Sequence, residues 1–333
     1  MEYSKPNILQ KPDYEKFTVI GLACFAILLV STVLQLASVY LTRRFAPLWT
    51  TQSWFIWAAA FIPLYAVGVP IGVALFKFIP SDRIEMRKLR FRDLLIFLIM
   101  CFPVMYIGNI IGTLFNTALH TLLGTEMTNP LDFLINSSNI WLAALVMVIL
   151  APVTEEFIFR KLIIDRLRAY GEGVCVLVSA LLFGLFHGNL SQFFYAFGLG
   201  AIFAFLYVKT GRLRYPIFLH MVINFYGGIV SPLLLKGLDL DALTQASGGS
   251  PEALMRWMAE YLPQLMAISI NAIVNFSLVI AGIVLLIVRR KAFFLAPGPL
   301  QPAKGTGFSL LFLNPGMALF VVAALALFIL SLF

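Results

Sequence analysis

The chain has 333 residues, of which 61% are hydrophobic and only 12% are charged. The charged share is about half of that in soluble domains, and so much apolar surface excludes both a water-soluble enzyme and a disordered chain. The apolar runs are roughly 18 or more residues long, which indicates membrane-spanning helices rather than the short strands of a membrane β-barrel. The sequence therefore predicts an all-α polytopic membrane protein, a bundle of about eight to nine transmembrane helices.

We expect residues 1–333 to form a single membrane domain. Residues 17–139 contain the N-terminal helices, residues 140–235 a core that carries the motifs described below, and residues 236–333 an external loop and the C-terminal helices. The nine predicted segments are 17–41, 54–79, 94–122, 140–159, 174–188, 192–208, 215–235, 264–288 and 310–333.

Local sequence features refine this division. The first segment is too long for the apolar part of a cleavable signal peptide, so we expect it to remain as a helix. The fifth and sixth segments are joined by only a few residues, which predicts a tight helical hairpin. Asn314, Pro315 and Gly316 break the start of the last segment. Within 236–262, four large apolar side chains recur at helical spacing and predict an interfacial amphipathic helix: Leu254, Trp257, Met258 and Tyr261.

The net charge of +8 arises from 24 Lys and Arg residues against 16 Asp and Glu residues. In a membrane protein such an excess is typical of cytoplasmic loops, so we expect no nucleic-acid partner. With a cytoplasmic N-terminus, 20 of the cations fall on the cytoplasmic side and four on the other side, including Arg43 and Arg44. This asymmetry predicts a multi-pass protein whose N-terminus is cytoplasmic.

Acidic residues inside the membrane are rare and indicate a functional site. Fourteen of the sixteen acidic residues fall in predicted loops or tails, and Glu155 and Glu156 remain near the end of the fourth segment. Glu156 and Arg160 are four residues apart, so their side chains can pair on one helix face, whereas Glu155 points elsewhere and stays free to exchange a proton. The alternative is a helix end at which both acids reach toward water.

Two of the three histidines also fall in membrane segments. His187 closes the fifth segment, and His220 shares a helix face with Asn224 in the seventh. An intramembrane histidine can simply form a hydrogen bond between helices, but two of them near a Glu pair favour a catalytic site. His120, at the external end of the third segment, is expected to be interfacial and not catalytic.

Other polar and small residues are expected to pack helices together. They are the stripe Asn109, Thr113 and Asn116, the pair Asn271 and Asn275, and the glycine pairs Gly108/Gly112 and Gly184/Gly188. The polar stripes could instead line the floor of a cavity. Three dispersed cysteines in apolar runs, Cys24, Cys101 and Cys175, are expected to be small buried side chains rather than a disulfide or zinc set.

Three short motifs, in the fourth, fifth and seventh segments, resemble those of the CAAX-protease and bacteriocin-processing family of intramembrane proteases. They are Glu155-Glu156-x-x-x-Arg160, Phe183-x-x-x-His187 and His220-x-x-x-Asn224. The family includes type II CAAX prenyl endopeptidases and prokaryotic relatives associated with bacteriocin self-immunity. The resemblance covers residues 140–235 and implies an intramembrane endopeptidase that acts on a membrane-associated or lipidated peptide or protein, prenylated in the family's eukaryotic use.

Peptide-bond hydrolysis needs a base for water, donors for the oxyanion and an acid for the leaving amine. We expect Glu155 to be the base and His187 to share or relay the proton. His220 and Asn224 can both donate to one oxyanion, and Arg160 holds Glu156. Phe183 is expected to line the cavity or bind the substrate. The cavity should open to the cytoplasm.

The cofactor and the function each have alternatives. His187, His220 and a Glu could bind zinc and leave a position for water, although the His-Glu-x-x-His helix of soluble zinc proteases is absent and a metal-free site is preferred. The chain could instead be a membrane scaffold or a bacteriocin self-immunity protein without protease activity. A proton-coupled transporter is the third possibility, because buried Glu and His also form proton relays, but no repeat is apparent.

Overall fold

The computed structural model describes residues 11–82, 84–125, 140–300 and 307–333. Seven of its helices are long and apolar enough to cross a membrane: Tyr14–Phe45, Ser53–Phe78, Phe91–Leu123, Ile140–Tyr170, Leu190–Thr210, Arg214–Leu235 and Leu262–Val288. Two shorter apolar helices, Glu172–Phe186 and Pro315–Leu330, complete the set. All nine predicted segments are therefore helical, and the prediction of an all-α polytopic membrane protein is confirmed.

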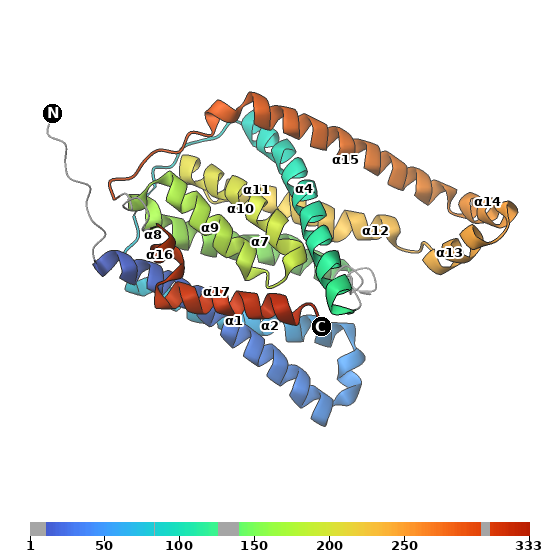
Figure 1. The fold of residues 1–333 in the computed structure, drawn as a ribbon, viewed down its shortest axis with the longest axis horizontal. Helices are drawn as coiled ribbons and strands as arrows, with labels where there is room; N and C mark the ends of the chain where they lie inside the picture. Colours follow the sequence, from blue (N-terminus) through green and yellow to red (C-terminus); the bar gives the residue numbers. More distant parts are fainter. Residues whose placement is uncertain (1–10, 83, 126–139, 301–306) are drawn as a thin grey trace.

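The N-terminal helices form one side of the bundle. Helix α1 (Lys11–Phe45) turns back through the short helix η1 (Pro47–Thr51) into the second span. That span consists of α2 (Ser53–Ile62), the π-helical turn η2 (Pro63–Gly68) and α3 (Val69–Leu75). The last helix, α17 (Pro315–Leu330), lies along α1, so the two ends of the described chain pack together (Figure 1).

Helix α4 (Phe91–Leu123) crosses the molecule and packs against both α10 (Leu190–Thr210) and α15 (Leu262–Val288) (Figure 1). Gly108 and Gly112 permit the approach to α10, since a Cβ at Gly112 would lie 2.5 Å from the carbonyl oxygen of Ser191. The prediction that these glycines bring two helices close together is confirmed. Within the last turn of α4, His120 is buried and binds Thr125, so it lies at the predicted end of the helix without being exposed there.

The fourth span differs from the prediction at its end. It runs through α6 (Ile140–Ala143), the π-helical turn η4 (Ala144–Leu150), α7 (Ala151–Glu156), the π-helical turn η5 (Phe157–Ile164), α8 (Asp165–Leu167) and η6 (Arg168–Tyr170). This span was predicted to end at residue 159, with the charged residues that follow in a loop, and that prediction is wrong. The helix continues because the charges are paired inside the protein.

Contacts around these charges explain the continuation. Asp165 accepts a hydrogen bond from the hydroxyl of Tyr207 at 2.8 Å, and Arg166 donates to the carbonyl oxygen of Phe76 at 2.7 Å. Both side chains are buried, as is Arg160. Buried charges that are paired and hydrogen-bonded do not force a helix to end at the water boundary.

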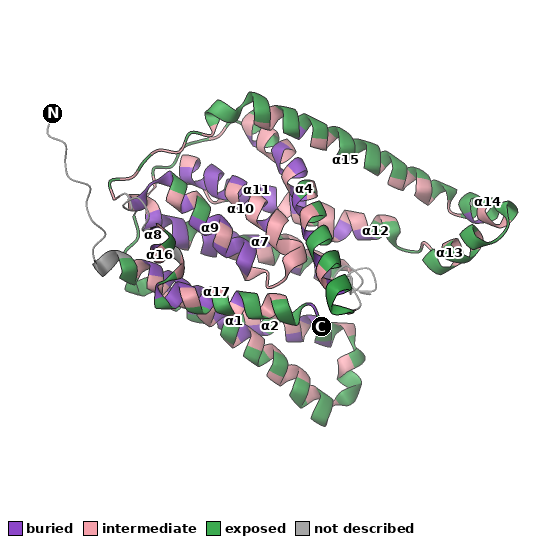
Figure 2. Ribbon diagram, viewed as in Figure 1, coloured by how far each residue is buried: buried purple, intermediate pink, exposed green. Residues whose placement is uncertain are grey.

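Helices α9 (Glu172–Phe186), α10 and α11 (Arg214–Phe225) form the buried centre of the bundle (Figure 2). The predicted hairpin between α9 and α10 is confirmed, because Asn189 caps α10 by accepting from the backbone N–H of Gln192 at 2.9 Å. The three cysteines are buried and unpaired, as expected.

Beyond α11 the chain passes through the π-helical turn η7 (Tyr226–Val230) and α12 (Ser231–Leu235) to a pair of short helices, α13 (Leu240–Gly248) and α14 (Pro251–Glu260). Helix α14 covers most of the predicted amphipathic segment, with Trp257 buried and Met258 exposed. Helix α15 then returns along the edge of the bundle and is mostly exposed (Figure 2). Asn314 separates α16 (Gly307–Phe312) from α17, as the predicted break required.

Candidate active site

The best-defined contact in the core is the pair of Glu156 and Arg160. Arg160 Nε donates to Glu156 Oε2 at 2.8 Å and Nη2 donates to Oε1 at 3.2 Å, so the pair is bidentate. Both side chains are 0% exposed. The predicted pairing across one helical turn is confirmed, and Arg160 is part of the core rather than of a loop.

Further contacts surround the guanidinium of Arg160. Its Nη1 donates to Ser179 Oγ at 2.8 Å, and Ser179 donates in turn to the carbonyl oxygen of Phe159 at 2.8 Å. The guanidinium also lies over the ring of Phe183, 4.7 Å from its centroid. Sequence reasoning missed Ser179, whose only signal is an isolated hydroxyl in an apolar helix. Together these contacts give the buried arginine partners on several sides.

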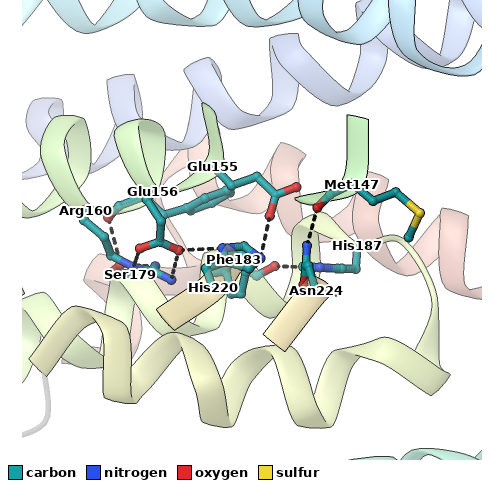
Figure 3. Close-up of polar contacts among 10 residues, drawn as sticks. Met147, Glu155, Glu156, Arg160, Ser179, Phe183, His187, His220 and Asn224 are labelled. Atoms are coloured by element: carbon teal, nitrogen blue, oxygen red, sulfur yellow. Dashed lines mark hydrogen bonds and ion pairs between the residues drawn. The ribbon is translucent and has the colours of Figure 1, made fainter. Parts of the chain in front are cut away.

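His220 lies between the two glutamates (Figure 3). Its Nδ1 is 3.0 Å from Glu156 Oε1, and its Nε2 is 3.8 Å from Glu155 Oε2. The ring stacks on Phe203 with centroids 5.4 Å apart, and the edge of Phe183 approaches at 5.7 Å. Helix α11 therefore brings His220 to the carboxylates of α7, 64 residues earlier in the chain.

Glu155 is the less enclosed of the two acids. Its side chain retains 19% exposure, whereas that of Glu156 has none. Glu155 makes no bidentate pair with Arg160 and instead interacts electrostatically with His187, Tyr65 and Tyr195. The two tyrosines come from η2 and α10 and were not singled out in the sequence.

His187 occupies the C-cap of α9, and its Nδ1 lies 2.8 Å from the carbonyl oxygen of Phe183. Because a carbonyl only accepts, Nδ1 carries the proton and Nε2 is left for other contacts. The Phe183 ring meets the rings of His187 and His220 edge-on, at 4.9 Å and 5.7 Å. The structure thus brings both predicted histidines to one aromatic side chain.

Phe183 was expected to line the cavity or bind the substrate, and this role stays a prediction. Its side chain is 2% exposed and is enclosed by Arg160, the two histidines and Phe159. A ring so enclosed offers little surface to a substrate. Its contacts assign it to holding the imidazoles and the guanidinium in place.

Asn224 lies one turn after His220 on α11, and its Nδ2 donates to the carbonyl oxygen of Met147 at 2.8 Å (Figure 3). Met147 belongs to the π-helical turn η4, where the backbone departs from regular α-helical bonding. One N–H of the Asn224 amide is thereby fixed, and the second remains available.

The sequence left zinc as the alternative to a metal-free site. Among the residues that the structure describes, no three His, Cys, Asp or Glu side chains are grouped so that they could hold a metal ion. Both nitrogens of His220 face carboxylates, Nδ1 that of Glu156 and Nε2 that of Glu155. These side chains do not fit the expected zinc ligand set.

The fold and this site define a polytopic membrane protein with a buried Glu–Arg–His cluster inside its helical bundle. Residues 137–226 match the family of type II CAAX prenyl endopeptidase Rce1-like proteins. This range contains all seven residues singled out by the motifs.

Individual relatives agree with this match. The chain is 33% identical over 106 residues to the putative membrane peptidase YdiL of Bacillus subtilis, covering 31% of this chain and 42% of the relative. It is 35% identical over 106 residues to the membrane-embedded CAAX protease MroQ of Staphylococcus aureus, covering 30% and 41%. It is 32% identical over 100 residues to the human CAAX prenyl protease 2, covering 24% and 30%.

This central region of the chain is therefore similar to CAAX proteases. The chain spans less than half the length of these curated relatives in the matches. No solved structure is significantly similar to it.

Proposed function

We propose that the protein is an intramembrane endopeptidase that hydrolyses a peptide bond of a membrane-associated or lipidated peptide or protein. The observation that carries this proposal is the placement of His220 between two carboxylates, one neutralised by Arg160 and one free. The similarity of residues 137–226 to type II CAAX prenyl endopeptidases supports it.

The gap between Glu155 and His220 suits a water molecule. His220 Nδ1 donates to Glu156, since an ionised carboxylate only accepts, so the neutral ring presents an unprotonated Nε2 toward Glu155. Two acceptors 3.8 Å apart can each receive one hydrogen of a bridging water. The oxygen of that water is then free to attack a carbonyl carbon while its proton passes to Glu155 or His220.

This assignment differs from the one expected from the sequence. His220 and Asn224 were expected to donate together to the oxyanion, but His220 is engaged by the two carboxylates. Asn224, with one amide N–H fixed by Met147, donates its second N–H to the developing oxyanion. Nε2 of His187, which is unprotonated because Nδ1 donates to Phe183, accepts the proton that Glu155 took from the water and passes it to the leaving amine as the carbon–nitrogen bond breaks. Glu156 and Arg160 orient His220.

The substrate reaches the site from the membrane or its cytoplasmic surface. The relatives named CAAX protease and CAAX prenyl protease suggest a peptide near a lipid anchor, prenylated or otherwise lipidated. The N-terminus and the opening of the site lie on the cytoplasmic side in this proposal, because cation-rich loops are retained there. No step requires a metal.

The test is cleavage of membrane-anchored peptides by purified protein in liposomes prepared with ¹⁸O-labelled water. We expect a new C-terminus that carries one ¹⁸O atom, detected by mass spectrometry, and its loss in Glu155→Gln. The matched control is Glu252→Gln, which changes an exposed carboxylate on α14. A wild-type protein that cleaves none of the peptides refutes the proposal and favours a scaffold or self-immunity function, and uptake of solutes into the liposomes would indicate a transporter.

A further inference from the structure

A second polar cluster lies within the membrane region, at the junction of η7, α4 and α15. The Tyr226 hydroxyl donates to Asn271 Oδ1 at 2.8 Å and accepts from Asn275 Nδ2. Tyr106 of α4 is hydrogen-bonded to the same hydroxyl. The ring of Tyr226 packs against Phe102, with centroids 5.8 Å apart. This group, Tyr106, Tyr226, Asn271 and Asn275, is called the Tyr226 cluster below.

Stability alone does not explain the composition of this cluster. Asn275 is 5% exposed, and its Oδ1 has no hydrogen-bond partner among the described residues. A buried acceptor without a partner is unfavourable, and an apolar residue at this position would avoid that penalty. The cluster therefore has a use other than attaching one apolar helix to another.

The cluster is next to Asn224 in the chain but on the other side of the helix. Two residues along a helix correspond to a rotation of about 200°, so Asn224 and Tyr226 face nearly opposite directions. Asn224 bonds to Met147 in η4 on one side, and Tyr226 bonds to α15 on the other. This end of the motif-bearing helix is thus held between two hydrogen-bonded contacts.

Helix α15 packs mainly against α4, and its Leu278 and Val279 contact the apolar core that includes Ile223 of α11. It approaches α4 closely at Gly282, where a Cβ would lie 2.5 Å from the carbonyl oxygen of Ile99. At its far end Gln264 donates to the carbonyl oxygens of Leu234 and Lys236, both at 2.9 Å. Residues 262–288 lie outside the range matched by the family. The Tyr226 cluster therefore joins α15 by hydrogen bonds to the turn that directly follows Asn224.

We propose that Tyr226, Asn271 and Asn275 are positioning residues that set the orientation of the Asn224 amide toward the oxyanion. The inference rests on the proposed function, in which Asn224 is the oxyanion donor. It extends the site to α15 and predicts that the hydrogen bonds of Tyr226 affect turnover through Asn224. Small misplacements of a catalytic group lower kcat strongly while substrate binding is retained.

The test is a kinetic cycle on a reporter peptide that the wild-type protein cleaves. We expect Tyr226→Phe and Asn271→Leu each to lower kcat about tenfold with KM unchanged, and the double variant to be no slower than Tyr226→Phe, because Tyr226→Phe alone already removes the hydrogen bond to Asn271. In an Asn224→Ala background, Tyr226→Phe should cause no further loss. Single-turnover reactions with excess enzyme keep the slow Asn224→Ala rate measurable. Gln264→Leu is the matched control, since it also removes hydrogen bonds of α15, but 11 residues from Asn275, and it should leave kcat unchanged.

Other outcomes overturn the inference. A Tyr226→Phe protein with wild-type kcat refutes it while leaving the proposed function intact, provided that Asn224→Ala is impaired. A full tenfold loss that persists in the Asn224→Ala background shows that Tyr226 does not act through Asn224. An equal loss in Gln264→Leu would mean that any loosening of α15 is sufficient. If the wild-type protein cleaves nothing, the proposed function fails and this inference fails with it.

Discussion

Arg160→Ala should both destabilise and inactivate the protein. The guanidinium donates to Glu156 at 2.8 Å and 3.2 Å and to Ser179 at 2.8 Å, and none of the Arg160 or Glu156 side chain is exposed. Its removal leaves a fully buried carboxylate without its cation, which typically costs about 3–5 kcal/mol. By the scaling of soluble proteins, the melting temperature of a 333-residue chain should fall by about 4–7 °C.

Thermal unfolding can be followed with a thiol-reactive dye, because the three native cysteines are all buried and become reactive only on unfolding. The control is Arg87→Ala, which removes a cation that pairs with Glu85 at 2.9 Å, where the two side chains are 69% and 76% exposed. Such a pair contributes about 0–1 kcal/mol, so this variant should melt close to the wild type. An Arg160→Ala protein that is as stable and active as Arg87→Ala would refute the buried pair.

A second variant separates stability from activity at the same position. Replacing a buried ion pair by apolar residues of similar volume is often neutral or stabilising. Glu156→Leu combined with Arg160→Met should therefore recover most of the lost melting temperature. It should remain inactive, because Nδ1 of His220 then lacks the carboxylate that orients it. Restored cleavage in this double variant would show that Glu156 and Arg160 serve the fold alone.

Two further predictions concern the chemistry. Glu155→Gln and His187→Ala should each lower the cleavage rate by a factor of about 10² or more with melting temperatures near that of the wild type, and retained activity would remove the residue concerned from the mechanism. Dialysed protein without zinc detectable by elemental analysis should keep full activity in the presence of strong chelators, because the described side chains do not form a three-ligand group. Stoichiometric zinc that disappears in a His187→Ala/His220→Ala double variant would contradict this expectation.

Features that depend on one helix could be predicted from the sequence. The spans follow from the lengths of the apolar runs, and the pair of Glu156 and Arg160 follows from the spacing of an α-helix. The hairpin at Asn189 is equally local. For these features the distances between side chains are set within one helix or turn, and tertiary packing does not change them.

Features that depend on packing between helices could not be predicted. His220 could have faced the same oxyanion as Asn224, or it could have faced the carboxylates. Which of the two occurs depends on how α11 packs against α7, and the spacing of residues within α11 does not contain that information. The same limit hid Ser179, which matters only because α9 places it beside Arg160. The end of the fourth span was missed because charged residues in a sequence indicate the end of a membrane helix unless their buried partners are known.

The last prediction concerns the side from which the site is reached. The cation-rich segments that the sequence places on one side also meet in the structure: the N–H of Arg87 donates to the carbonyl oxygen of Thr210 at 2.8 Å, and Arg289 lies 3.7 Å from Asp93. Since cations are retained on the cytoplasmic side, this end of the bundle should face the cytoplasm.

Single cysteines in a background without the native ones can be labelled from each side with a membrane-impermeant thiol reagent. Lys88→Cys, beside these segments, should label only from the cytoplasm, and Ser247→Cys, exposed on α13, only from outside.

Glu155 retains 19% exposure, and hydrolysis requires water at its carboxylate inside an apolar core about 30 Å thick. Glu155→Cys should therefore label from the cytoplasmic side, more slowly than Lys88→Cys because the position is partly enclosed. Labelling of Ser247→Cys from the cytoplasm would reverse the orientation. Labelling of Glu155→Cys only from outside, with the two surface markers as expected, would keep the orientation and place the opening of the site on the opposite face.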